Sequence, residues 1–402
     1  MGGQASSEER VVEPSYEDPT TQHYFVPECR RVNTKEDQLS NVLSFISIND
    51  NKKDYMWYFT TLRNKILDKL MEISPAFKSL SNGNDLAGSY ADGLKVVSPN
   101  EFDFHVYLRL REFSLLDVQR SEGFPGQVDI NVKRVLNKIR NMYQYDAVYK
   151  VLSKLIDDNN ILSPKKLQSW LEGLMVRALN EIGSSFTMDG NKFYLQYGKS
   201  GPAHTLYVTV NQRDSFSIDF VPVIKIMVNE HWPSERDPVT LEVNNFWVAV
   251  AKPKPCTNSF QTSFEFMERK LIKSKYNLKA VDRLLKKMRD RHGLTNLKSY
   301  YIKTVCLWKD DEVSMQFWSK SLYYVFTEVF KKLLTFCENQ EMPFFWDEDQ
   351  NMFDKLSNAQ KRDIYLKLHK IYQEFERSAP RDIANIFLTR NELMAFNDTV
   401  PE

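Results

Sequence analysis

The stretch that decides the fold runs Leu86-Ala-Gly-Ser-Tyr-Ala-Asp-Gly-Leu-Lys-Val-Val-Ser-Pro-Asn-Glu-Phe-Asp-Phe-His-Val106. Its first part, Gly88-Ser89, can place backbone N–H groups and a hydroxyl at a helix N-terminus, where nucleotide phosphates bind well. Twelve residues on, Glu101 and Asp103 alternate with two phenylalanines. On a strand this alternation sends both carboxylates to one face and the aromatic rings to the other. The stretch therefore predicts a phosphate site beside a pair of acids.

A third acid completes the arrangement. In Ser217-Ile218-Asp219-Phe220-Val221, apolar side chains alternate with one carboxylate, about 115 residues after the first pair. Carboxylates held side by side repel, and Mg²⁺ or Mn²⁺ bridging to triphosphate oxygens is the usual compensation. We expect Glu101, Asp103 and Asp219 to hold two such ions, one at the triphosphate and one that lowers the pKa of an attacking ribose hydroxyl. Each feature alone is commonly a solvated face or a cap, so the combination carries the prediction.

The segments around these motifs predict an α+β chain. Residues 36 to 74 show apolar positions at helical spacing, and Pro75 ends or bends that segment. Residues 102 to 110 and 192 to 224 alternate with period two and predict strands. Beyond about residue 260, helical spacing continues almost to the end. We expect a bilobal fold with a mixed β-sheet catalytic lobe, a long spine helix and a C-terminal helical lobe.

Three regions follow from this pattern. Residues 1–35 are acidic, contain three prolines and show no apolar period, which predicts a disordered tail. Residues 36–255 are expected to form the catalytic lobe and residues 256–402 the helical lobe.

Composition sets the class of protein. The chain has 402 residues, 42% of them apolar, and a net charge of +1, so it can bury a large core and is not a polyanion binder overall. Its four cysteines lie too far apart for a zinc site, and no apolar run suits a membrane span or a secretory signal, which favours the cytoplasm. Met1-Gly2-Gly3-Gln4-Ala5-Ser6 fits the pattern for N-myristoylation of Gly2 or matches it by chance, and membrane contact is expected only with that acyl chain.

The motifs resemble a known family. Gly88-Ser89, Glu101-x-Asp103 and Asp219 are similar to the signature of template-independent nucleotidyltransferases. From about residue 40 to 375, the chain resembles the cyclic GMP-AMP synthase family and its animal receptor-like relatives. Further segments in that family's order are Gly201-Pro202-Ala203, Trp232-Pro233, Thr262-Ser263-Phe264, Lys298-Ser299-Tyr300-Tyr301-Ile302-Lys303-Thr304 and Pro343-Phe344-Phe345.

The resemblance implies roles for individual residues, and it implies that Glu101, Asp103 and Asp219 hold the metals. The residues it places at the nucleotides are Gly88, Ser89, Ser263, Lys279, Ser299 and Tyr300. Among them, Tyr300 stacks on a nucleobase and Ser299 bonds a phosphate, roles that suit a ring and a hydroxyl. An aromatic core pair is the alternative interpretation of these two positions.

The chain also departs from the family's pattern. Gln261 and Glu265 stand where members often carry an Arg and a second Ser, and Asp282 stands near the expected phosphate-binding Lys279. The His and Cys residues of the family's zinc insertion are absent between 257 and 291, so no zinc is expected. These differences leave base choice and linkage open.

A concentration of positive charge replaces the zinc insertion. Residues 269 to 303 hold twelve Lys and Arg against two Asp, a net charge of +10. An apolar stripe at 281, 284, 285 and 288 predicts that the cations between these positions lie on the outer side of a helix, at a spacing suited to a phosphate backbone. With the spine helix, the predicted nucleic-acid contacts are Lys52, Lys53, Arg63, Lys69, Arg283, Lys286 and Lys287. An ordinary solvated charged face is the alternative.

These inferences combine into one hypothesis and two alternatives. The chain is expected to be a cytosolic sensor that double-stranded RNA, rather than DNA, activates to make a cyclic dinucleotide of the cyclic GMP-AMP type from ATP and GTP for innate immune signalling. The sequence does not decide whether the protein dimerises on its ligand. One alternative is an enzyme that makes a linear oligonucleotide, and the other is a catalytically silent interaction protein on the same scaffold.

Overall fold

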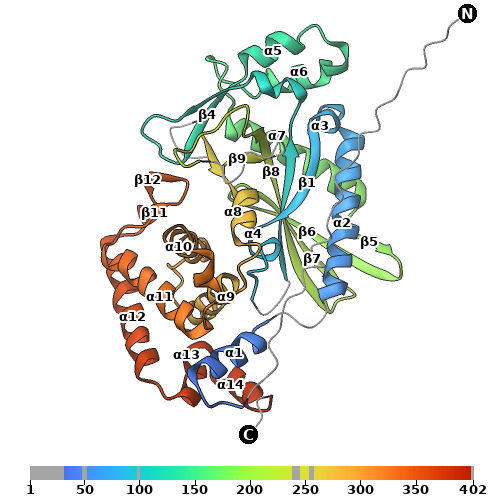
Figure 1. The fold of residues 1–402 in the computed structure, drawn as a ribbon. Coiled ribbons are helices and arrows are strands. Elements are labelled where there is room, and N and C mark those ends of the chain that lie inside the picture. The colour runs from blue at the N-terminus through green and yellow to red at the C-terminus, as the bar shows by residue number, and fades with distance from the viewer. Residues whose placement is uncertain (1–30, 48–51, 97–99, 238–244, 253–257, 400–402) are drawn as a thin grey trace, which may run out of the picture.

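The computed structural model describes residues 31–47, 52–96, 100–237, 245–252 and 258–399. The predicted acylation site Gly2 and most of the predicted tail lie outside these residues, as do the side chains of Lys52 and Lys53. The chain folds into a sheet-containing lobe and a helical lobe, so the predicted α+β class is confirmed (Figure 1). No helix in the described part of the chain has both the length and the apolar character needed to cross a bilayer.

One mixed sheet organises the catalytic lobe. Its strands are β1 Ser81–Ala87, β2 Glu101–Leu108, β3 Asp117–Arg120, β4 Gln127–Asn131, β5 Ser185–Met188, β6 Asn191–Ser200, β7 Ala203–Val210, β8 Asp214–Met227, β9 Phe246–Val250 and β10 Phe260–Ser263. The order is β3-β4-β10-β9-β8-β7-β6-β5, with β2 added to β8 and β1 to β2. Because β8 pairs with β2, β7 and β9, the sheet branches at this strand and opens a face on which distant side chains meet.

Period-two alternation makes β2 a strand with two different faces. Phe102 and Phe104 are fully buried, whereas Glu101 is exposed and Asp103 is half-buried. The phenylalanines pack on the spine helix α2, Lys52–Ile73, where the Phe59 ring stacks on Phe102 with centroids 4.9 Å apart. Burying each of these rings contributes about 1.5–3 kcal/mol. The core therefore fixes which face of β2 carries the acids.

Helices cover the sheet and end where their sequence signals place them. The helix α2 ends at Ile73, just before Pro75, as the sequence predicts. In addition, Ser74 caps the short helix α3, with Pro75 at its first position. The other helices of this lobe are α3 Pro75–Leu80, α4 Gly88–Ala91, α5 Lys133–Ile139, α6 Asp146–Leu152 and α7 Pro164–Ile182, with 3₁₀ turns at Arg111–Leu115 and Tyr143–Tyr145. Both α5 and α6 lie at the top of the molecule, away from the helical lobe (Figure 1).

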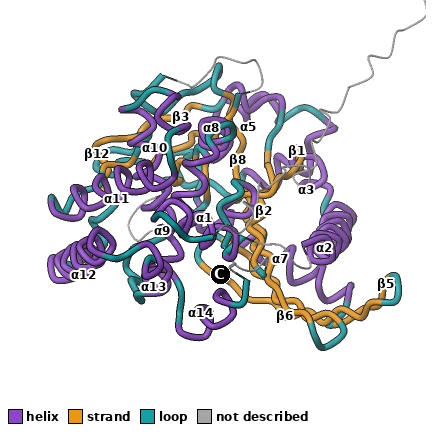
Figure 2. Tube along the Cα trace, turned by 60° about the horizontal axis from the view of Figure 1, so that its bottom comes forward, coloured by secondary structure: helices purple, strands orange, loops and turns teal. Residues whose placement is uncertain are grey.

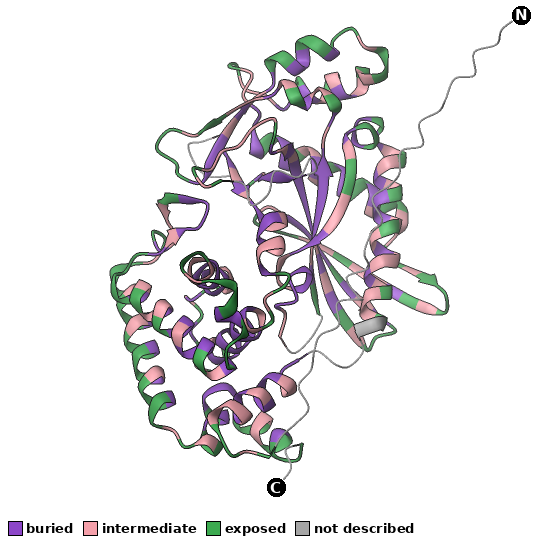
Figure 3. Ribbon diagram, in the orientation of Figure 1, coloured by how far each residue is buried: buried purple, intermediate pink, exposed green. Residues whose placement is uncertain are grey.

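The C-terminal lobe is built around one central helix. Its elements are α8 Glu265–Ile272, α9 Tyr276–Arg291, α10 Ser299–Glu312, α11 Leu322–Glu338, α12 Asn358–Arg377, α13 Ala384–Phe387 and α14 Arg390–Asn397, with 3₁₀ turns at Met315–Ser319 and Pro380–Asp382. Helices α8, α10, α11 and α13 all contact α9, and so does α1, Lys35–Phe45, from the other end of the chain. Figure 3 shows α9 and α10 largely buried inside this lobe. The helix α9 is therefore enclosed rather than laid on the surface.

Two pieces of sheet after residue 260 depart from the helical pattern predicted there. Strand β10 belongs to the large sheet, and the hairpin of β11 Pro343–Phe344 and β12 Asp347–Asn351 projects from the helical lobe toward β4 (Figures 1 and 2). The hairpin has few apolar residues in alternation, so period-two analysis does not detect it. It nevertheless brings the two lobes into contact on one side of the site.

Candidate functional site

The acids meet in one row across the sheet. Asp103 on β2 pairs directly with Asp219 on the neighbouring parallel strand β8, so both carboxylates leave the same face about 5 Å apart at the backbone. Ala87 on β1 and Thr205 on β7 extend the row on either side. Glu101 follows two residues before Asp103 on that same face. The structure therefore brings together the three acids that the sequence singles out.

The turn after β1 fits closely over this row. Gly88 follows Ala87 with φ of +63°, a conformation that side chains other than glycine rarely adopt. A Cβ atom there would lie 1.9 Å from Oδ2 of Asp103. Gly88 is therefore required twice, by its backbone angle and by the carboxylate beneath it, and Ser89 follows at the start of α4.

A fourth acid, Glu265, joins the cluster. Its Oε2 accepts a hydrogen bond from the Gly88 N–H at 3.2 Å. Burial raises the pKa of Asp103 to about 7, and the charges of Glu265, Glu101 and Asp219 add to the shift. Burial also raises the pKa of Asp219. The sequence showed Glu265 only as a departure from the family's pattern, because nothing local links it to residues so far upstream.

Two of the acids are held by other side chains. Lys95 Nζ contacts Glu101 Oε2 at 2.9 Å, and the Thr205 hydroxyl donates to Asp219 Oδ1 at 2.6 Å. In this conformation, no three Asp, Glu, His or Cys side chains of the described residues are arranged to hold a metal ion. The donor set itself is all carboxylate oxygen, which Mg²⁺ and Mn²⁺ prefer. Burial first, and the neighbouring carboxylates second, raise the pKa of Asp103, and a bound cation would offset both. The residues therefore fit such an ion in chemistry, with Lys95 as a competing partner.

A cavity of about 250 Å³ lies against the acids. From the catalytic lobe it is lined by Gly88, Ser89, Asp92, Leu94, Glu101 and Asp103, and from the helical lobe by Glu265, Lys286, Ser299, Tyr300 and Lys303. Six of the residues predicted for catalysis or nucleotide binding thus line one cavity: Gly88, Ser89, Glu101, Asp103, Ser299 and Tyr300. Arg289 donates to the Ser299 hydroxyl at 2.6 Å, which sets a cation beside that predicted phosphate contact.

A larger cavity of about 550 Å³ adjoins the first and shares Glu265 and Tyr300 with it. Ser263 and Gln261 on β10 line it, Phe124 and Pro125 form part of its edge, and the β11–β12 hairpin supplies further wall. Lysines 252, 298 and 355 also line this cavity. Its size and its mixture of rings, amides and cations suit a nucleotide.

Buried ion pairs form part of the wall of the smaller cavity, and no pattern in the sequence predicts them. Lys303 Nζ contacts Asp92 Oδ2 at 2.6 Å and Glu268 Oε2 at 2.7 Å, with all three side chains almost fully buried. Burial lowers the pKa of Lys303, but the carboxylates of Asp92 and Glu268 outweigh it and the pKa rises. Tyr300 donates its hydroxyl to Glu268 at 2.6 Å, so the network orients the predicted stacking ring. The sequence identifies the segment that contains Lys303 as a family motif, but it does not predict the partners of this lysine.

Lys279 lies outside both cavity linings but near this network. Burial lowers its pKa, and the charge of Asp92 opposes that shift. Arg269 contacts Asp85 at 2.7 Å and Asp92 at 3.5 Å. Several cations of the +10 segment thus face the site from behind.

The prediction that α9 presents an outer row of cations is wrong in its geometry. Arg283, Lys286 and Lys287 expose only 3%, 5% and 6% of their surface. Arg283 donates to the Ser47 hydroxyl at 3.2 Å, Lys286 contacts Asp282 at 2.6 Å and Lys287 pairs with Glu392. The helix is enclosed by its neighbours, so cations between the apolar positions are also buried and find partners inside the lobe.

The predicted cations of α2 are placed differently. Arg63 is half-buried over the Phe59 ring, and Lys69 contacts Glu72 at 2.6 Å and Glu181 at 3.3 Å. Exposed cations that form no ion pair within the described part of the chain gather instead on α5 and the turn after it. They are Lys133, Arg134, Lys138 and Arg140, with no acid between 132 and 145. These four cations are not among the predicted nucleic-acid contacts, because the +10 segment carries much more charge.

The chain is similar to known proteins along most of its length. A family model described as Mab-21 protein nucleotidyltransferase domain matches residues 90–274, and one described as Mab-21 protein HhH/H2TH-like domain matches residues 277–370. A cyclic GMP-AMP synthase-like receptor of Lucilia cuprina is 32% identical over 349 residues, which cover 86% of this chain and 93% of the relative. Another, of Aethina tumida, is 32% identical over 377 residues, 89% of this chain and 93% of the relative. Cyclic GMP-AMP synthase-like receptor 1 of Drosophila melanogaster is 31% identical over 341 residues, 83% of this chain and 89% of the relative.

Proposed function

Because this chain belongs to the cyclic GMP-AMP synthase-like receptor family and carries a Mab-21 nucleotidyltransferase domain, we propose that it joins ATP and GTP into a cyclic dinucleotide. The observation that carries the proposal is the direct pairing of Asp103 with Asp219 on neighbouring strands, because Asp103 lines the smaller cavity together with Ser89 and Tyr300. The product would serve as a second messenger in the cytoplasm for innate immune signalling.

In the proposed reaction, a ribose hydroxyl of the acceptor nucleotide attacks the α-phosphorus of the donor. The bond to the β-phosphate oxygen breaks, pyrophosphate leaves, and the hydroxyl proton passes to a carboxylate. Asp219 suits the role of proton acceptor because burial raises its pKa and Thr205 fixes one of its oxygens. A second such step within the linear dinucleotide closes the ring.

The chain's own residues position the two nucleotides. Ser89 from the catalytic lobe and Ser299 from the helical lobe both line the smaller cavity and would hold the donor's triphosphate, with Arg289 bound to the Ser299 hydroxyl. Tyr300 lines both cavities, and its hydroxyl is fixed by Glu268, so one face of its ring would stack on a base. Lys279 would contribute positive charge from behind the site.

Divalent cations are part of the proposal. Glu101, Asp103 and Asp219 would hold Mg²⁺ or Mn²⁺, which would neutralise the triphosphate and lower the pKa of the attacking hydroxyl. For this, Glu101 has to exchange its contact with Lys95 for the cation. The released Lys95 ammonium would then be free to meet a phosphate oxygen.

Activation by double-stranded RNA is the regulatory part of the proposal. The support is the word receptor in the relatives' names and the exposed cations of α5 and of the turn after it, Lys133, Arg134, Lys138 and Arg140, which form no ion pair with other described residues. Phosphate contacts of this kind read the shape of a duplex rather than its sequence. Binding there and on α2 would shift the population toward a catalytically competent conformation.

The test is a product assay. The purified protein is incubated with ATP, GTP, Mg²⁺ or Mn²⁺, with and without a long RNA duplex, and the products are treated with phosphatase and weighed by mass spectrometry. A phosphatase-resistant product with the mass of a cyclic dinucleotide supports the proposal, whereas a linear product favours an oligonucleotide-forming enzyme. Loss of all Mg²⁺-dependent nucleotide binding would favour a silent interaction protein.

A further inference from the structure

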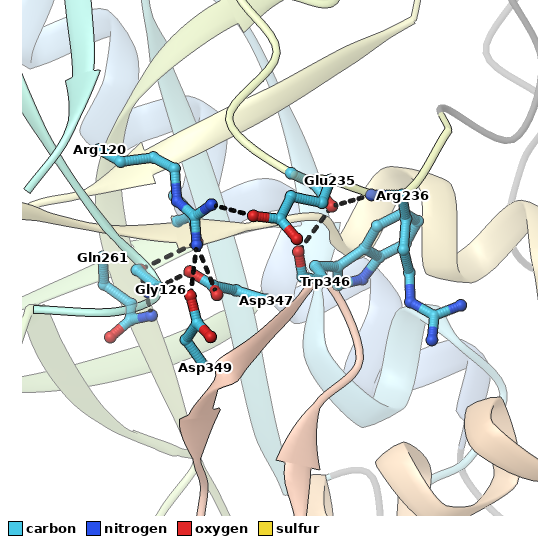
Figure 4. Close-up of polar contacts among 10 residues, drawn as sticks. Arg120, Gly126, Glu235, Arg236, Gln261, Trp346, Asp347 and Asp349 are labelled. Carbon is cyan, nitrogen blue, oxygen red and sulfur yellow. Dashed lines mark hydrogen bonds and ion pairs between the residues drawn. The ribbon is translucent and has the colours of Figure 1, made fainter.

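The β11–β12 hairpin is the part of the helical lobe that reaches the catalytic lobe beside the larger cavity. Figure 4 shows its tip, Trp346 to Asp349, surrounded by side chains from the catalytic lobe. The Ser234 hydroxyl donates to the Trp346 carbonyl at 2.6 Å, and Arg236 contacts Glu348 at 3.1 Å. Residues after β8 and at the end of β3 therefore hold one short hairpin from two directions.

Arg120, the last residue of β3, makes the most concentrated contact. One guanidinium nitrogen lies 2.7 Å from Glu235, and the other lies 2.8 Å from Asp347 and 3.4 Å from Asp349. The three carboxylates differ in burial, because the side chains of Glu235 and Asp349 are 82% and 75% exposed and that of Asp347 is 8% exposed. Exposed pairs contribute little, so Asp347 is the partner whose loss costs most.

The second oxygen of Asp347 continues the connection. Asp347 Oδ2 accepts a hydrogen bond from the Gly126 N–H at 2.7 Å. The Gly126 carbonyl in turn accepts from the Gln261 amide at 2.8 Å and from the Thr262 hydroxyl and N–H at 3.0 Å. Asp347 is therefore linked through one backbone position to β10, which carries the predicted base contact Ser263.

Gly126 is suited to this place by its shape. Its φ is +71°, and a Cβ atom would lie 1.8 Å from the Gln350 side chain. The hairpin therefore packs directly on the backbone of the β3–β4 turn. Phe124 and Pro125 of that turn and Phe344, Gln350, Asn351 and Met352 of the hairpin line the same 550 Å³ cavity.

We propose that Arg120 is a positioning residue that, through Asp347, holds the β11–β12 hairpin in place as the wall of the larger cavity and so sets the binding of the nucleotide that occupies it. This inference rests on the proposed function for the identity of that nucleotide. The planar guanidinium spans two partners at once, which a lysine ammonium does less well. Without Arg120, the carboxylate of Asp347 keeps only the Gly126 N–H, and the contact of Arg236 with Glu348 remains as the charged contact between the hairpin and the catalytic lobe.

The experiment compares Arg120→Leu, Arg120→Lys and Asp347→Asn with the full-length protein. The KM for ATP and for GTP and kcat are measured separately, and hydrogen exchange is followed at the amides of residues 343–352 with and without each nucleotide and Mg²⁺. We expect a 10- to 100-fold higher KM for one of the two nucleotides, less than about a threefold change in the other, and a smaller change in kcat. Hairpin amides should exchange faster, and Arg120→Lys should recover part of the loss.

Glu235→Gln and Asp349→Asn are the matched controls, because each removes an exposed partner of the same arginine. They should leave both KM values within about twofold of the parent. Equal changes in both KM values, or unchanged hairpin exchange in Arg120→Leu, would overturn the inference. Should Arg120→Leu fail to fold, Arg120→Lys and Asp347→Asn decide by the same criteria.

The outcome also separates this inference from the proposed function. If the parent protein makes no product, the proposed reaction fails, yet the hairpin can still be tested by binding. Protection of residues 343–352 by Mg²⁺ with ATP or GTP would then weaken at least tenfold in apparent affinity in Arg120→Leu and stay unchanged in Glu235→Gln. Equal affinity in both variants would reject the positioning role.

Discussion

The acid row on β2 and β8 and the basic helix α9 are two charged regions within one protein, and they are handled in opposite ways. On α9, cations buried among helices pair with carboxylates such as Asp282 and Glu392. On the sheet, Asp103 sits beside Glu101, Asp219 and Glu265, and burial with these neighbours raises its pKa to about 7. One region is internally compensated, and the other holds repulsion that a substrate or cation would relieve.

The difference teaches where function is to be sought. Buried charges with partners commonly serve the fold, whereas like charges kept together against their own repulsion cluster at functional sites. The net charge along the sequence would instead suggest the +10 segment as the functional region. Partner geometry, and not charge density, separates the two regions.

The largest expected effect breaks the acid row. Asp219→Asn should reduce product formation at least about 1,000-fold, because the amide neither accepts the proton nor binds a cation as a carboxylate does. Its hydrogen bond with Thr205 can be kept, so thermal unfolding should change little. Turnover is measured by labelled triphosphates on thin-layer plates, with Thr209→Val on the neighbouring strand as a control. Retained activity would contradict the assignment of Asp219.

The next effect breaks the compensation on α9. Lys286→Met should lower the free energy of unfolding by about 3–5 kcal/mol, because it leaves Asp282 buried without its cation. Urea unfolding measures the loss, and Lys138→Met on exposed α5 is the matched control. Replacing both partners, as in Lys286→Met with Asp282→Leu, should recover much of the stability. Equal stability of Lys286→Met and the parent would show that the pair contributes nothing.

In the acid row, removal of a charge should stabilise the protein, whereas removal of the Lys286 charge on α9 should destabilise it. A folded-state pKa of about 7 for Asp103 lies above the ordinary value of 3.8, so the folded protein binds a proton more tightly and loses stability as pH rises from about 4 to 7. Without divalent cations, Asp103→Asn should therefore be more stable than the parent at pH 8, by about 2–4 kcal/mol, and equally stable at pH 4. Thermal scans at the two pH values measure this, and a destabilised variant at pH 8 would contradict it.

The smallest effect concerns the exposed cations of α5. Lys138→Gln should change the free energy of unfolding by less than about 0.5 kcal/mol, because the side chain is exposed and has no ion pair. If RNA duplexes contact this helix, the same substitution should reduce the slope of log affinity against log salt by about 1. Filter binding over a salt series measures the slope. An unchanged slope would place the duplex elsewhere on the protein.

Much of the fold and of the acid row could be predicted because the signals are local or carry a fixed period. Alternation around Phe102 and Ile218 identified two strands and the face of each that carries acid. The resemblance to the nucleotidyltransferases then placed these acids in one site. The structure adds the register, in which Asp103 and Asp219 are direct neighbours.

The rest depends on contacts between distant residues. The helical period identifies the apolar stripe of α9 but carries no information on the helices that enclose its remaining faces. It therefore predicts exposed positions for Arg283, Lys286 and Lys287, which the structure buries. Glu265 reaches the acid row only because the turn at Gly88 lies beside α8. The β11–β12 hairpin is too short to leave a period-two signal, and its buried aromatic residues Phe344, Phe345 and Trp346 follow one another without alternation. Each of these was missed because its partner lies on another element.

The packing of α1 on the helical lobe has a consequence for synthesis of the chain. Lys35 donates to the carbonyls of Phe375 and Glu376, about 340 residues later, and Glu36 accepts from the first N–H groups of α11. At a ribosomal rate of about 5–20 residues per second, α1 waits roughly 20 to 70 s for these partners to emerge. Its apolar side chains Leu39, Val42 and Leu43 are uncovered during that time, so the nascent chain offers chaperones a binding segment until translation has nearly finished.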